Sequence, residues 1–142
     1  MPYNESNSDK PGPLQGVRII DITTFILGPF ASQFLGDMGA DVIKVETETG
    51  DASRNTGIRK SDNMAAYFMV FNRNKRSISL NLKRPQAFDA LMKLLETADV
   101  LVYNMRPPAA KRLGLDYESL KKRFPRLIHA SACGYHKDGP NG

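Results

Sequence analysis

The side chains that could act as a nucleophile or as a general acid or base are few in this sequence. Cys133 follows a β-rich segment, where a buried and inert thiol is the expected state. His129 lies inside that segment and is expected to be a hydrogen-bonded core residue, whereas His136 lies in a loop, which favours an exposed and functional side chain. Asp21 and Asp99 flank predicted strands, where they are expected to bind backbone N–H groups or to cap turns. One loop histidine without a partner is weak evidence, so these residues predict no catalytic constellation.

Basic side chains gather at the ends of predicted strands, where they could bind an anion. The sequence holds 20 Lys and Arg against 15 Asp and Glu, a net charge of +5. Several Arg and Lys contacts, together with backbone amides at helix N-termini, are how proteins hold a polyphosphate group. Solubilising surface charge explains the same spacing at least as well, so both interpretations stay open. The basic residues concerned are Arg73, Lys75, Arg76, Lys83, Arg84, Arg106, Lys111 and Arg112.

The loop after the first predicted strand does not match a dinucleotide-binding turn. That turn needs three glycines in the pattern G-x-G-x-x-G, for a tight bend, for the approach of the pyrophosphate and for helix packing. The segment 23–29 holds only Gly28. Glu46, at the end of the second predicted strand, has the position of a ribose-binding acid, but without the glycines it is expected to be a solvated strand-end charge.

Short β-branched segments alternate with helical patterns along the chain, and this order predicts an open α/β sheet. Residues 17–22 and 41–46 have the composition of buried parallel strands and enclose a helical pattern, so a right-handed parallel unit is expected. Ligands of such sheets bind beyond the carboxyl ends of the strands. The predicted strands are 17–22, 41–46, 78–82, 99–103 and 127–132, and the predicted helices are 30–38, 64–71, 85–95, 107–114 and 116–120.

Local signals predict where some of these elements begin and end. Pro29 suits the first turn of the first helix, and Gly39 suits a left-handed cap at its end. Asp116 is expected to cap the helix that follows it. The polar segment 47–63 is too long for an ordinary connection and is expected to be a functional loop, and 72–76 is expected to be a basic turn.

Length and composition restrict the class of protein. A chain of 142 residues with 41% hydrophobic residues makes one globular domain or a piece of a larger one. Cys133 is the single cysteine, which excludes an internal disulfide framework and a zinc cage, so no metal and a reducing, cytoplasmic setting are expected. No apolar run predicts a membrane span or a secretory signal, and residues 1–13 are expected to be a disordered leader. A nucleic-acid partner is not expected, because only the net charge favours one.

A series of motifs runs in order from Pro13 to Pro140. They are Pro13 to Asp21 (PLQGVRIID), Gly28-Pro29, Gly39 to Glu46 (GADVIKVE), Gly50-Asp51 with Arg54, Asn72 to Ser77 (NRNKRS), Ala98 to Val102, Asn104 with Arg106-Pro107, Arg112 to Leu115, Pro125 to Ile128, and Gly139-Pro140. Together they resemble the N-terminal part of the family III CoA-transferases, the formyl-CoA and carnitine-type transferases that also include acyl-CoA racemases.

The resemblance implies a Rossmann-like open parallel sheet with helices on both faces, in the larger of two domains. It implies that residues 14–142 form the N-terminal part of that domain, that two chains interlock in a homodimer, and that the substrates are an acyl-CoA and a carboxylic acid. Coenzyme A would lie along the carboxyl ends of the strands, with Lys83 and Arg112 supplying charge to its phosphates and apolar loop side chains sheltering adenine. The positions that match family contacts to CoA are Ile26, Leu27, Leu80, Lys83, Asn104, Met105, Arg106 and Arg112.

The sequence departs from the family pattern at three of the matched loops. Leu27 stands where the family usually has alanine, and Met105 where it usually has an aromatic residue, so both are expected to reshape the CoA contacts. His136 follows Gly134-Tyr135 where a glycine is common, and histidine seldom adopts the backbone angles that glycine reaches.

The catalytic residue of the family has no counterpart in this sequence. The family's catalytic aspartate lies shortly after the Gly-Pro that matches Gly139-Pro140, and Asp138 lies on the wrong side of it. The chain is therefore expected to be a fragment or truncated product that carries much of the CoA-binding half and is inactive alone. A racemase or epimerase of the same family and a non-catalytic CoA-binding remnant are the alternatives, and the acyl donor and acceptor acid stay open.

Overall fold

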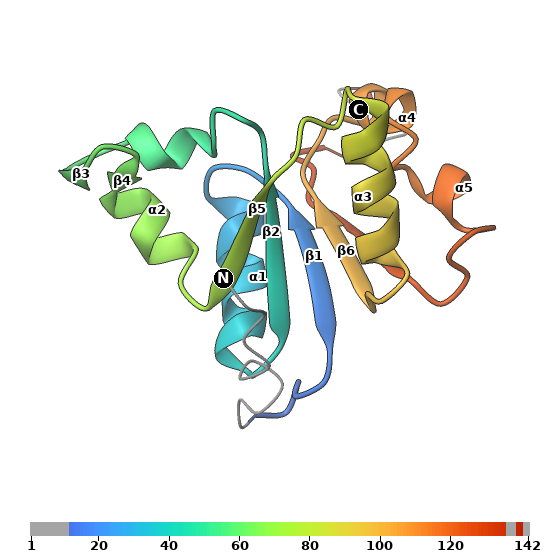
Figure 1. Cartoon of the computed structure of the whole chain (residues 1–142), viewed down its shortest axis with the longest axis horizontal. Coiled ribbons are helices and arrows are strands. Elements are labelled where there is room, and N and C mark those ends of the chain that lie inside the picture. The colour runs from blue at the N-terminus through green and yellow to red at the C-terminus, as the bar shows by residue number, and fades with distance from the viewer. Residues whose placement is uncertain (1–11, 136–138, 141–142) are drawn as a thin grey trace.

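One parallel sheet organises the molecule, for which the computed structural model describes residues 12–135 and 139–140 (Figure 1). The strand order is β5-β2-β1-β6-β7, and every neighbouring pair is parallel. Along the chain, β2 and β5 are added on one side of β1, and β6 and β7 are then added on the other side. The boundary between β1 and β6 is therefore the topological switch point of the sheet. The bounds are Arg18–Ile22 for β1, Asp41–Glu46 for β2, Lys75–Ser79 for β5, Val100–Tyr103 for β6 and Ile128–Ser131 for β7.

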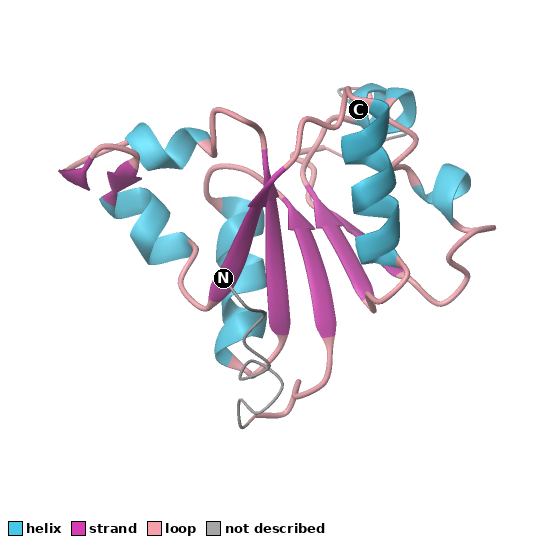
Figure 2. Ribbon diagram, viewed as in Figure 1, coloured by secondary structure: helices cyan, strands magenta, loops and turns pink. Residues whose placement is uncertain are grey.

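Helices cover both faces of the sheet, as the sequence predicts (Figure 2). Helix α1, Leu27–Asp37, packs through Leu35 on the face that carries Ile19 and Val42. Helix α3, Pro85–Leu95, packs with Leu91 and its neighbours on the opposite face. Alternate residues of one strand, such as Ile19 and Ile20, enter different cores because side chains of a strand point to opposite faces. Helices α4, Pro107–Arg112, and α5, Tyr117–Leu120, join the α3 side.

The small and polar residues of helix α1 face the interior of the protein. Ser32, Gln33 and Gly36 are buried on its inner side. A Cβ atom added at Gly36 would lie 3.2 Å from the Asn74 carbonyl oxygen, which indicates a close approach of helix and chain. The apolar residues at helical spacing are therefore exposed, and they form a stripe of Leu27, Phe30, Phe34 and Met38.

The polar segment after β2 is more ordered than the sequence predicts. It contains a short 3₁₀ helix, η2, at Ala52–Asn55 and a small antiparallel pair of β3, Arg59–Ser61, with β4, Met64–Ala65. Helix α2 then begins at residue 66 rather than 64 and spans Ala66–Phe71. These elements form a lobe beside the β5 edge of the sheet (Figure 1).

The prediction for strand β5 is wrong in position. The alternating residues 78–82 favour a strand there, but β5 spans Lys75–Ser79 and begins inside the predicted basic turn. It pairs with β2 from Val42↔Lys75 onward. This register buries the Lys75 ammonium group against Asp21, a contact that the local pattern does not reveal. Residues 80–82 consequently follow the strand and lie beyond its carboxyl end.

Several local predictions are confirmed. Pro29 lies in the first turn of α1, Gly39 follows that helix with φ +100°, and the Asp116 carboxylate caps α5 by accepting from the Ser119 N–H. Near the start of the described residues, the Leu14 N–H donates to the Met38 carbonyl oxygen and the Gln15 N–H to that of Gly12. Residues 1–11 of the predicted leader lie outside the described residues, so the leader stays a prediction. Within the described ranges, every helix is too short or too polar to cross a membrane.

Candidate functional site

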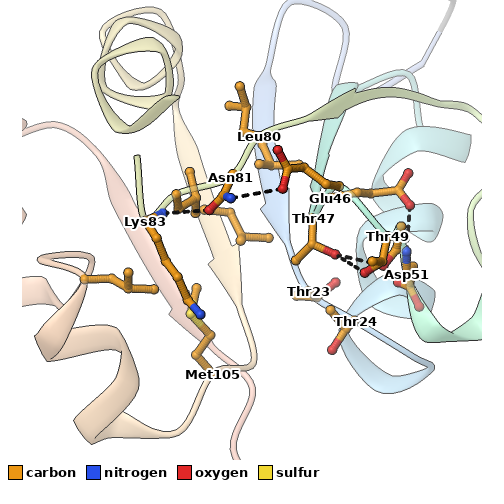
Figure 3. A pocket seen from close by; sticks show the side chains of 16 residues that line it. Thr23, Thr24, Glu46, Thr47, Thr49, Asp51, Leu80, Asn81, Lys83 and Met105 are labelled. Atoms are coloured by element: carbon orange, nitrogen blue, oxygen red, sulfur yellow. Dashed lines mark hydrogen bonds between the residues drawn. The ribbon is translucent and has the colours of Figure 1, made fainter. Parts of the chain in front are cut away.

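A cavity of about 390 Å³ lies at the carboxyl ends of four parallel strands (Figure 3). Loops after β1, β2, β5 and β6 meet there because parallel strands all end at the same edge of the sheet. The lining residues are Ile22, Thr23, Thr24, Val45, Glu46, Thr47, Glu48, Thr49, Gly50, Asp51, Leu80, Asn81, Leu82, Lys83, Met105 and Leu113.

The cavity combines apolar walls with a polar rim. Val45, Leu82 and Leu113 belong to the apolar part of the lining, whereas threonine hydroxyls, Asn81 and Lys83 supply polar groups. The Asn81 amide donates to a Glu48 carboxylate oxygen at 3.0 Å, and its carbonyl oxygen accepts from the Lys83 backbone N–H (Figure 3). Such a lining suits a ligand with a flat apolar group that carries polar substituents.

Three of the eight residues proposed from the sequence line this cavity. Leu80 and Lys83 come from the loop after β5, and Met105 comes from the loop after β6. Figure 3 shows Lys83 extending toward Met105, so residues from two separate loops approach one another. The structure thus places these three at one site.

The other five proposed residues lie outside the lining. Asn104 instead binds the backbone of Thr24 on both sides, with Oδ1 accepting from the Thr24 N–H at 3.0 Å and Nδ2 donating to the Thr24 carbonyl at 2.9 Å. Arg106 is an exposed residue that precedes α4, and Arg112 is exposed at the end of α4, directly before the lining residue Leu113. Ile26 ends the β1–α1 loop, and Leu27 is the first residue of α1, with its side chain exposed.

Three of the eight basic residues that could bind an anion lie away from the cavity. Arg73 pairs with Asp37 at the end of α1, with Nη2 2.7 Å from the carboxylate. The Arg76 guanidinium binds Asp41 at the amino end of β2. Lys75 is buried, as described above, so these cations neutralise carboxylates of the fold and do not form part of the cavity edge. Of the two interpretations that the sequence leaves open, anion binding at the cavity is therefore wrong for these three cations.

Glu46 is a buried ion-pair partner and not the solvated charge that the sequence predicts. The Arg54 guanidinium binds it with two hydrogen bonds of 2.7 Å, while the Asp51 N–H and the Ser77 hydroxyl donate to the same carboxylate. Burial raises the pKa of Glu46, but the hydrogen bonds from Arg54 and Ser77 outweigh it and hold the pKa below its ordinary value. The Arg54 guanidinium also lies 3.6 Å from the centroid of the Phe68 ring, which ties the lobe to the sheet.

A second buried carboxylate, Asp21, lies inside β1. It accepts from the Thr23 N–H at 2.8 Å, as expected for a residue near a turn, and it also binds Lys75 Nζ at 2.9 Å and the Ser32 hydroxyl at 2.6 Å. Burial raises its pKa, but the positive charges of Lys75 and Lys44 outweigh that effect and lower it. Asp21 therefore remains ionised beneath the β1–α1 loop.

The third buried carboxylate is Asp51, for which the sequence predicts no role in the site. Lys44 Nζ lies 2.8 Å from Asp51 Oδ2, and both side chains are almost completely buried. Asp51 Oδ1 also caps η2 by accepting from the Ser53 N–H and hydroxyl, each at 2.8 Å. Burial raises the pKa of Asp51, but hydrogen bonds from Lys44 and Ser53 lower it further than burial raises it. The only sequence signal for this residue is its place in the Gly50-Asp51 motif.

The nucleophile and base candidates do not gather at the cavity. Cys133 is exposed, which contradicts the expected burial, and lies 3.0 Å from the Ser131 hydroxyl. Neither ring nitrogen of His129 has a hydrogen-bond partner among the described residues, which contradicts the expected hydrogen bonding. Asp99 accepts from the Arg18 N–H, as expected. His136 and Asp138 lie outside the described residues, and in the described part of the chain no group of three potential metal ligands occurs.

Comparison with known proteins adds independent information. A family model described as CoA-transferase family III matches residues 14–142. The succinyl-CoA:glutarate CoA-transferase of Mus musculus is 42% identical over 137 residues, which cover 96% of this chain and 31% of that protein. The succinate–glutarate CoA-transferase of Agrobacterium fabrum is 43% identical over 135 residues, which cover 90% of this chain and 34% of that protein.

The solved structures agree with the sequence comparison. A CAIB/BAIF family protein from Brucella suis superimposes with a TM-score of 0.86 at 38% identity, covering 92% of this chain and 36% of the other. The chain spans about a third of the length of the curated relatives it matches.

Proposed function

Because this chain belongs to CoA-transferase family III, we propose that it forms the CoA-binding part of an enzyme that moves CoA from an acyl-CoA donor to a carboxylic acid. The observation that carries the proposal is the cavity where loops from four strands meet at the carboxyl edge of the sheet. Its apolar walls suit the adenine ring, and its hydroxyl and amide groups suit the ribose. Lys83 in the lining, and Arg112 directly before the lining residue Leu113, supply positive charge for the phosphate groups.

The remaining proposed contacts extend from the cavity along the switch point. Met105 contributes an adaptable apolar side chain, and Leu80 packs against the core beneath the cavity. Ile26 and Leu27 continue the loop beyond Thr24, where they would contact the part of CoA that leaves the cavity. Arg106 begins the loop-to-helix turn after β6, and Asn104 acts through the backbone of Thr24.

Two of the three carboxylates that line the cavity have structural roles, and the third, Glu48, accepts a hydrogen bond from Asn81. Glu46 is held by Arg54, and Asp51 by Lys44, so neither presents a free nucleophile. In the proposed chemistry a carboxylate of the enzyme attacks the thioester carbonyl of the acyl-CoA, which gives a mixed anhydride and the CoA thiolate. The thiolate attacks the enzyme's carbonyl in that anhydride, which releases the donor acid and leaves CoA bound to the enzyme as a thioester. The acceptor carboxylate attacks this thioester to give a second anhydride, and the CoA thiolate set free then attacks the acceptor's carbonyl, which releases the new acyl-CoA and the enzyme carboxylate. That carboxylate is the aspartate expected beyond Gly139-Pro140, outside this chain.

A homodimer is part of the same proposal. The stripe leaves four large apolar side chains exposed, three on α1 and Met38 directly after it. Monomeric soluble proteins seldom expose a large contiguous apolar surface. Phe30 also contacts Phe34 and Phe71, with ring centroids 4.7 and 5.5 Å apart, so the stripe is continuous with the lobe. A second copy that covers this face would explain its composition.

Calorimetric titration of the chain with CoA tests the proposal. We expect saturable binding of CoA, weaker binding of 3′-dephospho-CoA and no turnover by the 142-residue chain alone. The complete gene product is then assayed with succinyl-CoA and glutarate, the substrates in the names of two relatives, and with other acids. Absence of CoA binding would refute the proposal. If the complete product binds CoA but transfers it to none of the acids tested, the hypothesis of a non-catalytic CoA-binding remnant would be supported instead.

A further inference from the structure

The backbone of Phe25 has a conformation that a phenylalanine rarely adopts. Its φ is +73°, in the left-handed region that favours glycine, and it lies in the short connection between β1 and α1. The Phe25 side chain is 45% exposed, so packing of its ring in the core does not hold this conformation. Contacts of the Phe25 backbone with other residues must therefore hold this conformation.

Asp51 supplies that restraint. The Phe25 N–H donates to the carboxylate of Asp51, with 3.2 Å to Oδ1 and 3.3 Å to Oδ2. The carboxylate cannot move freely, because Lys44 and Ser53 bind it and the residue is 2% exposed. A buried, fixed acceptor therefore meets the N–H group of a residue whose φ is unfavourable.

Lys44 extends the restraint to the other side of Thr24. Its Nζ donates to the Thr23 carbonyl oxygen at 2.8 Å while it binds Asp51 at the same distance. The Lys44 and Asp51 pair thus holds the peptide groups before and after Thr24, and Asn104 holds the N–H and carbonyl of Thr24 itself. Four consecutive backbone groups, from the Thr23 carbonyl to the Phe25 N–H, are therefore each bound by the side chain of Lys44, Asn104 or Asp51.

We infer that Lys44 and Asp51 are positioning residues that preset the β1–α1 loop for CoA binding, by holding Thr24 between them and Phe25 in the left-handed conformation. Thr23 and Thr24 line the cavity, so a change in this loop changes the cavity wall. The inference rests on the proposed function, since CoA is the ligand for which the loop is preset. A buried ion pair that only stabilised the fold would not need to contact the backbone at both sides of a lining residue.

A double-mutant cycle distinguishes positioning from a purely structural role. Asp51→Asn removes the charge with little change in shape, and Phe25→Gly removes the unfavourable contact of a Cβ atom at positive φ. We expect Asp51→Asn to weaken CoA binding about tenfold in the otherwise unchanged chain. In the Phe25→Gly background the same change should cost less than about threefold, because glycine adopts the loop conformation without the restraint. An equal loss in both backgrounds, or no loss in either, would overturn the inference.

A matched control and a ligand-free measurement complete the test. Asp116→Asn changes another aspartate that caps a helix through a serine, and it should leave CoA affinity unchanged. Hydrogen exchange of the Phe25 amide, measured without CoA, should rise at least tenfold in Asp51→Asn and should not rise in Asp116→Asn. Unchanged exchange at Phe25 would overturn the inference even where CoA binds. Failure of the unaltered chain to bind CoA would instead refute the proposed function, with the exchange result still deciding the restraint on the loop.

Discussion

Asn104, at the carboxyl end of β6, forms two hydrogen bonds with the backbone of Thr24, at the carboxyl end of β1. Its amide oxygen accepts from the Thr24 N–H and its amide nitrogen donates to the Thr24 carbonyl, at 3.0 and 2.9 Å. The two residues are separated by 80 positions in the sequence, and their contact closes the switch point of the sheet beside the cavity. The amide acts on the ligand site through the position of Thr24.

Replacing Asn104 should therefore loosen the cavity wall. Asn104→Ala removes both hydrogen bonds, and Asn104→Asp keeps an acceptor for the Thr24 N–H but places a carboxylate opposite the Thr24 carbonyl. We expect the alanine change to destabilise the chain by about 1 to 2 kcal/mol and to weaken CoA binding about fivefold. Urea denaturation and calorimetry measure the two effects. Loss of stability with full CoA affinity would show that Asn104 has no part in shaping the site.

Lys83 and Arg112 should contribute charge to CoA binding. Changing either to alanine should weaken CoA binding roughly five- to tenfold and reduce the dependence of affinity on salt, because a charge-assisted contact to phosphate is lost. Lys93→Ala is the matched control, since Lys93 is exposed in the last turn of α3, at the end of that helix opposite to Lys83. Unchanged affinity in both Lys83→Ala and Arg112→Ala would place the phosphates elsewhere.

Gly28 should not tolerate a side chain. A Cβ atom added there would lie 2.3 Å from Thr23 Cγ2, whereas one added at Gly134 would meet no atom within 4 Å. Gly28→Ala is expected to cost roughly 1 to 3 kcal/mol of stability, because Thr23 must shift within the loop. Gly134→Ala should change the denaturation midpoint little, and equal effects of the two substitutions would contradict this packing.

The chain should lose stability in acid partly through Glu46. Its pKa lies below the ordinary 4.5 in the folded state, so the stability that its carboxylate contributes is present above pH 4.5 and is lost as the pH falls through the lowered folded value. Glu46→Gln should be less stable at pH 7 and should show a flatter decline of denaturation midpoint below pH 4.5. Glu96→Gln, which changes an exposed carboxylate on the surface, should follow the unaltered profile. Parallel acid profiles for Glu46→Gln and the unaltered chain would count against this ion pair.

The apolar stripe on α1 should drive association. Phe34 is 47% exposed in the middle of the stripe, so Phe34→Glu places a charge in the proposed interface without entering the core. We expect sedimentation equilibrium to show self-association of the unaltered chain and at least a tenfold weaker association of the variant. Tyr135→Glu, at an exposed aromatic outside the stripe, serves as the control. A monomer at all concentrations would refute the proposed use of this face.

The sequence alone determined the class of fold and the edge of the sheet at which the cavity lies. β-Branched strands such as Asp41–Glu46, the left-handed Gly39 after a helix and a cap at Asp116 are local features, and local sterics and hydrogen bonding decide them. The order of these elements then implies a parallel sheet, because short connections and right-handed crossovers leave few other arrangements.

The tertiary structure decided which polar side chains lie at that edge and which are buried. Lys75 has the sequence context of a surface cation, yet its ammonium group is buried because Asp21, 54 positions away, lies opposite it. Asp51 reaches the Phe25 N–H across 26 positions, and neither residue's neighbours indicate the contact. Burial of a charge is favourable only when a partner of opposite charge or a hydrogen-bonding group is already placed beside it, and that placement depends on the packing of distant segments.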